Sequence, residues 1–523
     1  MASVIFSTLA WLLSPLWWLL SWVLSPVPLA ALAVAIVLGY RYYTKDFDYW
    51  KSKGVPGPPA KFPWGHGFST RSHEGRFPVT EFEDWLYNKH GGKKYCGYIE
   101  MRRPVLYVGD PDLIRAITVK DFDHFTDRRD LVLSKVFEKM LSILNGQEWK
   151  ETRAVMSPSF SSSKLKAMHQ LCLDNAAKLN QFLREEMQRK GEVELKDALG
   201  RFTMDNIASC GFGVNCNSFV DPNTEFATHA STLFKPPSGY AMFRLMVIML
   251  FPKWIGDCLP DPGKAATDFF QRVVNKTVAH REQHGSEQRD FLQLLLETKN
   301  KDGQRALSDS SIVAQSVLFF LAGYDTTSSL LTFAGYALAT SPDIQGAVQR
   351  EIDEVLAKHD GRLTYDAVSE MTYLDRVLAE TLRLYPTASR LERRCSKDYI
   401  LPGTDVLVKR GMIVGMPVFT LHRDPDHYPD PLRFDPDRFL PEEKAKRHPC
   451  AYIPFGNGPR NCIAMRFALF EAKVAMIAVL RENSLKPGSS TPPPPLPHDP
   501  YAFLLKPKDP LFLKVVPRSG DEA

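Results

Sequence analysis

The stretch Tyr452-Ile-Pro-Phe-Gly-Asn-Gly-Pro-Arg-Asn-Cys-Ile-Ala464 is followed by a run with helical apolar periodicity that reaches about Glu482. Its two glycines and its proline predict a tight loop, because a regular strand or helix would not tolerate them. Cys462 is expected at the start of the next helix. Backbone N–H groups and the helix dipole favour a thiolate there, and Arg460 adds a nearby cation. The pattern therefore predicts a cysteine presented to a metal.

The composition is that of a globular protein with ample core. The 523 residues are 44% hydrophobic and 24% charged, which argues against disorder over most of the chain. The net charge of +5 comes from dispersed lysines and arginines, and no concentrated basic stripe indicates a nucleic-acid partner. The 8 cysteines lack the spacing of a disulfide scaffold, which fits a reducing compartment. Cys210 and Cys216 form the closest pair, but no second pair stands at zinc-site spacing.

The N-terminal segment has the composition of a membrane span. Residues 1–40 contain no charged side chain, and their length exceeds the roughly 20 residues that cross a bilayer. The motif Ser25-Pro-Val-Pro28 divides them into two apolar pieces, of which one is enough to span. Positive residues from Arg41 onward predict that the rest of the chain lies on the cytoplasmic side. A cleaved signal peptide is the main alternative, but a basic leading region is missing and the apolar stretch is long for one.

These patterns divide the chain into three parts. Residues 1–43 are the predicted anchor, residues 44–60 a basic and proline-rich hinge, and residues 61–523 the globular domain. The hinge contains Val55-Pro-Gly-Pro-Pro59, a stiff segment because residues before proline prefer extended conformations. Helical patterns dominate the globular domain. Strands are predicted near 94–108, 399–416 and 501–516.

One long helix is predicted over Asp309 to Thr340, with Ser308 as its cap and Ser341-Pro342 as its end. The segment Ala322-Gly-Tyr-Asp-Thr-Thr327 lies inside it. Glycine weakens a helix interior, and hydroxyl side chains can bend a helix by bonding to its carbonyls. Two interpretations remain open from these residues alone, a local opening of the helix and a small-residue patch for close helix packing.

The cysteine block resembles the haem-binding loop of the cytochrome P450 family, in which the cysteine thiolate is the proximal ligand of the iron. The resemblance extends from the proline-rich hinge to the C-terminal strands and is especially close from Thr364 to Ala475. The animal microsomal members that oxidise xenobiotics and steroids are the most similar. The resemblance implies a mainly α fold with a small β-rich region, heme b (haem) as cofactor and Cys462 as its metal ligand. Ala464 stands where the family usually has glycine.

The resemblance also implies roles for residues outside the loop. In the family's oxygen-binding groove, the residues that match Thr326 and Asp325 relay protons, and Ala322 would border the haem face. The haem propionates need cations or donors, and bidentate arginine suits a carboxylate. Trp149 and Arg153 are four residues apart, so both could reach one carboxylate. By motif match, the predicted cofactor-binding residues are Arg128, Trp149, Arg153, Ala322, Arg393, Phe455, Arg460 and Cys462.

A second group of charged residues is assigned to structure. Glu380 and Arg383 are spaced to share one helix face, and such a pair is usually solvated. In the family, the two residues join an arginine matching Arg438 in a buried network that holds the haem-loop region. We therefore expect these three side chains to be buried together.

The implied reaction is insertion of one atom of O₂ into an apolar small molecule (xenobiotic, steroid or fatty-acid-like) at an endoplasmic reticulum membrane. Electrons would come from NADPH through cytochrome P450 reductase, since the chain has no Gly-rich nucleotide-binding fingerprint. Cytochrome b5 is a further candidate partner. One alternative is a haem-thiolate isomerase or dehydratase that acts on peroxides without a reductase. Another is a non-enzymic, membrane-tethered haem carrier or sensor.

Overall fold

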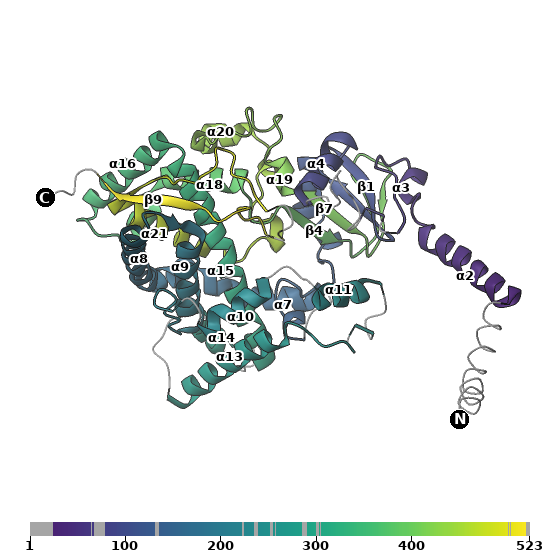
Figure 1. Cartoon of the computed structure of the whole chain (residues 1–523), viewed down its shortest axis with the longest axis horizontal. Helices are drawn as coiled ribbons and strands as arrows, with labels where there is room; N and C mark the ends of the chain where they lie inside the picture. The colour runs from purple at the N-terminus through teal and green to yellow at the C-terminus, as the bar shows by residue number, and fades with distance from the viewer. Residues whose placement is uncertain are drawn as a thin grey trace, which may run out of the picture.

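The computed structural model describes residues 25–518, apart from residues 64, 67–78, 131–134, 222–223, 235–238, 251–254, 257, 285–289, 300–302, 304, 500–501 and 503. A large helical body lies beside a smaller β-rich part, from which helix α2 projects (Figure 1). The helices of the β-rich side are α2 (Pro26–Thr44), α3 (Tyr49–Ser52), α4 (Val79–Lys89), α5 (Pro111–Arg115) and α19 (Val418–Leu421). The others are α6 (Lys135–Glu138), α7 (Gly146–Met156), α8 (Ser162–Lys190), α9 (Leu195–Phe212), α10 (Glu225–Phe234), α11 (Tyr240–Leu250), α13 (Lys264–His284), α14 (Phe291–Glu297), α15 (Asp309–Ala339), α16 (Pro342–Lys358), α17 (Tyr365–Glu370), α18 (Thr372–Leu384), α20 (Pro441–Lys446) and α21 (Met465–Glu482).

The strands form small sheets, as the mainly α prediction requires. The largest has the order β1-β2-β7-β4 and consists of β1 (Tyr95–Glu100), β2 (Arg103–Val108), β7 (Ile413–Pro417) and β4 (Arg390–Arg394). A second sheet has the order β3-β9-β8, from β3 (Val193–Glu194), β9 (Phe512–Pro517) and β8 (Asn483–Pro487), and β5 (Tyr399–Ile400) pairs with β6 (Leu407–Val408). Strands near 94–108 and 399–416 are confirmed, and β9 lies at the end of the third predicted region. β3, β4 and β8 were not predicted.

Helix α15 passes through the helical body and packs against α9, α13, α18 and α21. It runs without interruption from Asp309 to Ala339, and the Ser308 hydroxyl accepts a hydrogen bond from the Ser311 amide, so the predicted bounds and cap are confirmed. A Cβ atom at Gly323 would lie 2.8 Å from the Ile207 side chain of α9. The glycine therefore allows close helix packing, and the alternative of a local opening is not what the structure shows.

Two helices among the described residues are long and apolar enough to cross a membrane, and they differ in burial. α15 is 61% buried over its most apolar window and is a core helix. α2 begins at Pro26, inside the Ser25–Pro28 motif that was predicted to divide the apolar segment, and is 0% buried. Its composition and exposure are compatible with a membrane anchor. The first apolar piece, up to residue 24, lies outside the described residues.

Aromatic side chains and one arginine join the end of α2 to the β-rich part. The Arg102 guanidinium, in the turn between β1 and β2, lies 4.2 Å from the centre of the Tyr42 ring and 5.5 Å from that of Tyr43. The Phe62 ring packs 5.7 Å from Tyr43. The predicted hinge is packed as well, since Trp50 is buried and its indole N–H donates to the Tyr98 carbonyl at 3.0 Å. The segment 44–60 thus lies on the domain rather than apart from it.

The predicted charged network is present, with Glu380 and Arg383 buried and Arg438 partly buried. The Glu380 and Arg383 side chains are both fully buried and form an ion pair at 2.7 Å. The Arg438 Nε lies 3.6 Å from Glu380 Oε1. Arg383 also donates to the backbone carbonyls of His422 (2.9 Å) and Pro431 (2.8 Å). The network therefore joins α18 to the chain that precedes the cysteine loop.

Glu471 gives a test of the helical core, because its carboxyl group is buried in α21 and burial raises its pKa to about 8. Between its ordinary pKa near 4.5 and 8, only the unfolded state ionises, so stability should fall as the pH rises through this range. The slope is at most about 1.4 kcal/mol per pH unit. We expect Glu471→Gln to reduce this slope and Glu482→Gln, at the exposed end of the same helix, to leave it unchanged. Denaturant unfolding from pH 5 to 8 measures both, and equal slopes in all three proteins would contradict the assignment.

Candidate active site

The loop that precedes α21 holds Cys462 by backbone contacts. The Cys462 amide donates to the Phe455 carbonyl at 2.8 Å, and the Asn461 amide donates to the Gly458 carbonyl at 3.0 Å. Gly456 and Gly458 adopt φ of 78° and 69°, which L-residues rarely do. A Cβ atom at Gly458 would lie 1.8 Å from the Thr118 carbonyl oxygen. The tight loop predicted from these glycines is confirmed.

The position of Cys462 differs slightly from the prediction. α21 begins at Met465, so the cysteine lies just before the helix rather than at its start. The side chain is exposed to solvent, yet enclosure by the surrounding protein is the main effect on its thiol and raises the pKa. A thiol that solvent can reach but that protein surrounds on most sides lies in a recess. The Ala464 amide, Arg153 and Arg128 act in the opposite direction and lower the pKa.

The prediction that the pKa of the Cys462 thiol is lowered is therefore wrong for the protein without a bound metal. Desolvation outweighs the cations, because it penalises any charged form in a recess. The cations that lower the thiol pKa are Arg153 and Arg128, rather than Arg460. A raised thiol pKa does not prevent metal binding, because coordination itself deprotonates a thiol.

Four arginines converge on the same region. Burial lowers the pKa of Arg460 to about 9, with further lowering by Arg128 and Arg393. Burial, followed by repulsion from Arg128, lowers the pKa of Arg393 to about 9. Burial also lowers the pKa of Arg128 and of Arg153. The Arg393 Nε and the Arg460 Nη1 are buried without a hydrogen-bond partner among the described residues. Asp127 raises the pKa of Arg460, but burial and the neighbouring arginines outweigh it.

Several of these side chains also hold the loop and its neighbours. Arg153 donates to the carbonyl oxygen and to the side-chain Oδ1 of Asn461, both at 2.9 Å. Arg460 donates to the carbonyls of Thr126 (2.8 Å) and Leu144 (2.7 Å), and its guanidinium lies 4.1 Å from the centre of the Trp149 ring. The support of Asn461 by Arg153 was not predicted, because no local pattern connects α7 to the loop.

The α15 residues predicted to act together make separate contacts. Ala322 is exposed, and the Thr326 hydroxyl donates to the Ala322 carbonyl. The Asp325 carboxylate instead accepts a hydrogen bond from Lys196 of α9 at 2.9 Å. Lys196 Nζ also contacts the hydroxyls of Ser328 and Ser329, each at 2.8 Å. Sequence reasoning missed Lys196, which approaches α15 through tertiary packing.

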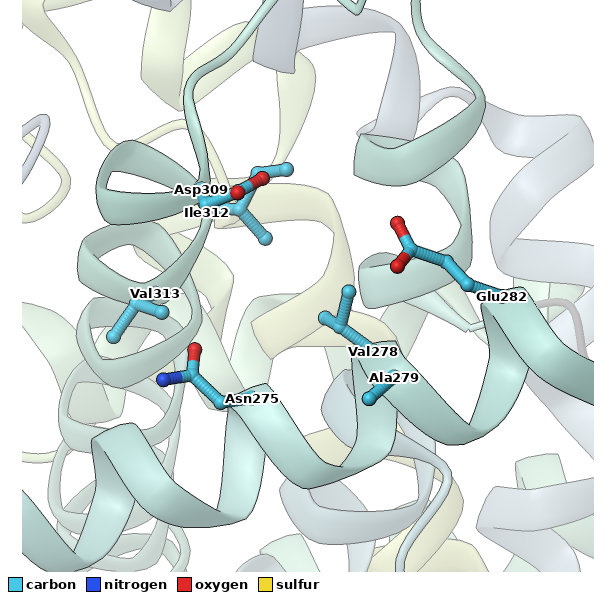
Figure 2. A pocket seen from close by; sticks show the side chains of 7 residues that line it. All are labelled: Asn275, Val278, Ala279, Glu282, Asp309, Ile312 and Val313. Atoms are coloured by element: carbon cyan, nitrogen blue, oxygen red, sulfur yellow. The ribbon is translucent and has the colours of Figure 1, made fainter.

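A cavity of about 300 Å³ lies between α13 and α15, and it is separate from these residues. Figure 2 shows Asn275, Val278 and Glu282 of α13 facing Asp309, Ile312 and Val313 of α15. None of the predicted site residues lines it. The predicted site residues therefore lie outside this cavity.

A family model described as Cytochrome P450 matches residues 55–515. The chain belongs to the cytochrome P450 family. Cytochrome P450 3A31 of Mesocricetus auratus is 40% identical over 498 residues, which cover 94% of this chain and 96% of the relative. Cytochrome P450 3A11 of Mus musculus is 40% identical over 510 residues, with the same coverage. Probable cytochrome P450 6a14 of Drosophila melanogaster is 35% identical over 514 residues, covering 93% of this chain and 99% of the relative.

Membership of the cytochrome P450 family makes the protein a monooxygenase with a haem iron ligated by a cysteine thiolate. It also implies a redox partner, O₂ and a small-molecule substrate. The structure fits such a cofactor in two respects. Cys462 lies in a recess, and the nearby arginines are buried cations with unpartnered N–H groups, which suits a ligand that carries two carboxylates.

Gly458 gives a test of the loop geometry. In Gly458→Ala the new methyl group would meet the Thr118 carbonyl, so the loop has to move. Gly403→Ala is the matched control, because Gly403 has the same φ of 69° and nothing within 4 Å of its Cβ position. We expect the control to lose about 1–2 kcal/mol from the backbone conformation alone. Gly458→Ala should lose clearly more stability and most of its haem, and equal losses in both variants would show that the contact with Thr118 does not matter.

Proposed function

We propose that Cys462 is the haem-iron ligand, and that the enzyme inserts one oxygen atom of O₂ into apolar molecules of the xenobiotic, steroid or fatty-acid type. The observation that supports this most directly is the recessed thiol of Cys462 next to a cluster of buried arginines. When bound, haem supplies oxygen activation, and its thiolate ligand favours O–O cleavage.

The surrounding residues take roles that follow from their chemistry. Arg393 and Arg460 have unused buried N–H groups and would bind the propionates, with Arg128 and Arg153 adding positive charge. Trp149 packs on Arg460 and holds its guanidinium in place. Phe455 would pack beside the cofactor, and the small side chain of Ala322 would leave room at its face.

Thr326 and Asp325 are the proposed proton-delivery residues. The Thr326 hydroxyl donates a hydrogen bond to the Ala322 carbonyl, and it can instead give its proton to a developing anion. The Asp325 side chain is 18% exposed, so it can exchange protons with solvent, and its ion pair with Lys196 holds the carboxylate in one orientation. Asp325 would have to leave Lys196 to reach Thr326 directly, unless ordered water joins them.

The domain boundaries and partners are proposed from the sequence and the position of α2. Residues 1–43 would anchor the protein in the endoplasmic reticulum membrane, residues 44–60 join anchor to domain, and residues 61–523 form the haem domain. The positive residues from Arg41 onward support a cytoplasmic catalytic domain. NADPH-cytochrome P450 reductase is the proposed electron donor, with cytochrome b5 as a second candidate.

The ligand assignment is tested by the difference spectrum of the dithionite-reduced, carbon-monoxide-bound protein in membranes. The wild type should show a strongly red-shifted Soret band, and Cys462→Ala should lose it completely because the thiolate is gone. Cys258→Ala removes the other exposed cysteine of the described residues and should keep the band. Retention of the band in Cys462→Ala would refute the assignment.

The proton-delivery role is tested by turnover with NADPH and reductase. Thr326→Ala should keep the haem spectrum but release electrons as peroxide, with product per NADPH falling by about tenfold or more. Thr332→Ala is the control, because this hydroxyl also bonds to the carbonyl four residues earlier in α15, at 2.6 Å, and is buried in the core. Unchanged coupling in Thr326→Ala would exclude the role. Product formation without NADPH or reductase would favour a peroxide isomerase.

A further inference from the structure

The side chain of Asn457 connects the cysteine loop to a π-helical turn elsewhere in the chain. This turn spans Ala116–Lys120 and follows α5 directly. Asn457 Nδ2 donates to the Thr118 hydroxyl oxygen at 3.1 Å and to the Cys450 sulfur at 3.2 Å. The Thr118 hydroxyl donates its own proton to the Ile114 carbonyl at 2.7 Å, so only its lone pairs are available to Asn457. Both amide protons of Asn457 are therefore used.

The backbone on either side reinforces this contact. Gly458, the next residue, packs directly on the Thr118 carbonyl. The Asn457 carbonyl oxygen accepts a hydrogen bond from Arg393 Nη2 at 3.4 Å, and Arg393 is one of the proposed propionate ligands. Asn457 thus lies where the turn, the arginine cluster and the cysteine loop meet. π-Helical turns are rare and frequently occur at functional sites.

The loop needs such a contact because its own sequence is permissive. Gly456 and Gly458 flank Asn457, and glycine restricts the backbone less than any other residue. A metal ligand, in contrast, has to be held within about 0.5 Å of its productive position. Backbone hydrogen bonds fix the loop near Phe455 and Cys462, whereas the side chain of Asn457 fixes its middle against a separate part of the fold.

We propose that Asn457 and Thr118 are positioning residues for the thiolate ligand: they hold the cysteine loop against the π-helical turn. This inference rests on the proposed role of Cys462. It assigns no chemical step to either residue. Their loss should let the loop shift, so that haem is released faster and part of the reduced protein loses thiolate ligation.

The test compares wild type, Asn457→Ala, Thr118→Val and the double variant as holoenzymes. The rate of haem transfer to excess apomyoglobin should rise about fivefold in Thr118→Val, which corresponds to one hydrogen bond of about 1 kcal/mol, and by at least as much in Asn457→Ala, which also loses the contact with Cys450. The fraction of the reduced carbon-monoxide complex without the red-shifted band should rise as well. Because Thr118 acts through its contact with Asn457, the double variant should resemble Asn457→Ala rather than multiply the effects of the two single variants.

Asn180→Ala separates positioning from general destabilisation. Asn180 is a buried residue of α8 and donates to the Ala478 carbonyl of α21 at 2.8 Å. The variant therefore loses a hydrogen bond to α21, the helix that follows the loop. It should lower the unfolding midpoint without changing haem release or the spectrum. If Asn457→Ala does not fold, Thr118→Val alone still gives both readouts.

Each result supports or overturns the proposal. Unchanged haem release in Asn457→Ala and Thr118→Val, effects that multiply in the double variant, or equal effects in Asn180→Ala would each overturn it. A wild-type protein without the red-shifted band would instead refute the ligand role of Cys462. The two failures are therefore distinguishable.

Discussion

The ion pair between Glu380 and Arg383 fixes the position from which the cysteine loop begins. Both side chains are fully buried, and a buried charge that loses its partner typically destabilises a protein by about 3–5 kcal/mol. Two hydrogen bonds connect the loop to the same region. The Tyr452 hydroxyl donates to the Ala379 carbonyl at 2.9 Å, next to Glu380, and the Ile453 amide donates to His422 Nε2 at 2.9 Å. The loop thus starts from a segment that cannot move without exposing or separating these charges.

The arginine cluster on the other side of the loop contains like charges, unlike the balanced ion pair of Glu380 and Arg383. Glu380 and Arg383 balance each other, whereas Arg393 and Arg460 are buried next to further cations. Desolvation and mutual repulsion make such a cluster unfavourable in the protein alone. A ligand with two carboxylates relieves both effects, and any ligand that binds only the folded state stabilises it. Haem binding and folding are therefore expected to be linked in this enzyme.

The features that could be predicted best are those that depend on residues close together in the sequence. The bounds of α15 and the tight turns at Gly456 and Gly458 follow from local signals, and the structure contains both. The contacts between distant segments could not be predicted in the same way. Lys196 binds Asp325 from α9, and the thiol of Cys462 is governed by desolvation rather than by Arg460. Both depend on how elements far apart in the chain pack together, which no local pattern encodes.

The contacts between α2 and Arg102 affect where the chain can be shortened at its N-terminus. Tyr42 and Tyr43 belong to α2 by position, yet both rings pack on the Arg102 guanidinium and the Tyr43 ring packs on Phe62 of the β-rich part. A shortened chain that begins after Thr44 would lose these ring contacts on Arg102 and on Phe62, a side chain that is 55% exposed even with α2 present. A chain that begins at Tyr40 would lack most of the apolar helix but would keep the packing of Tyr42 and Tyr43 on Arg102. The end of α2 therefore contributes to the packing of the β-rich part as well as to the apolar helix.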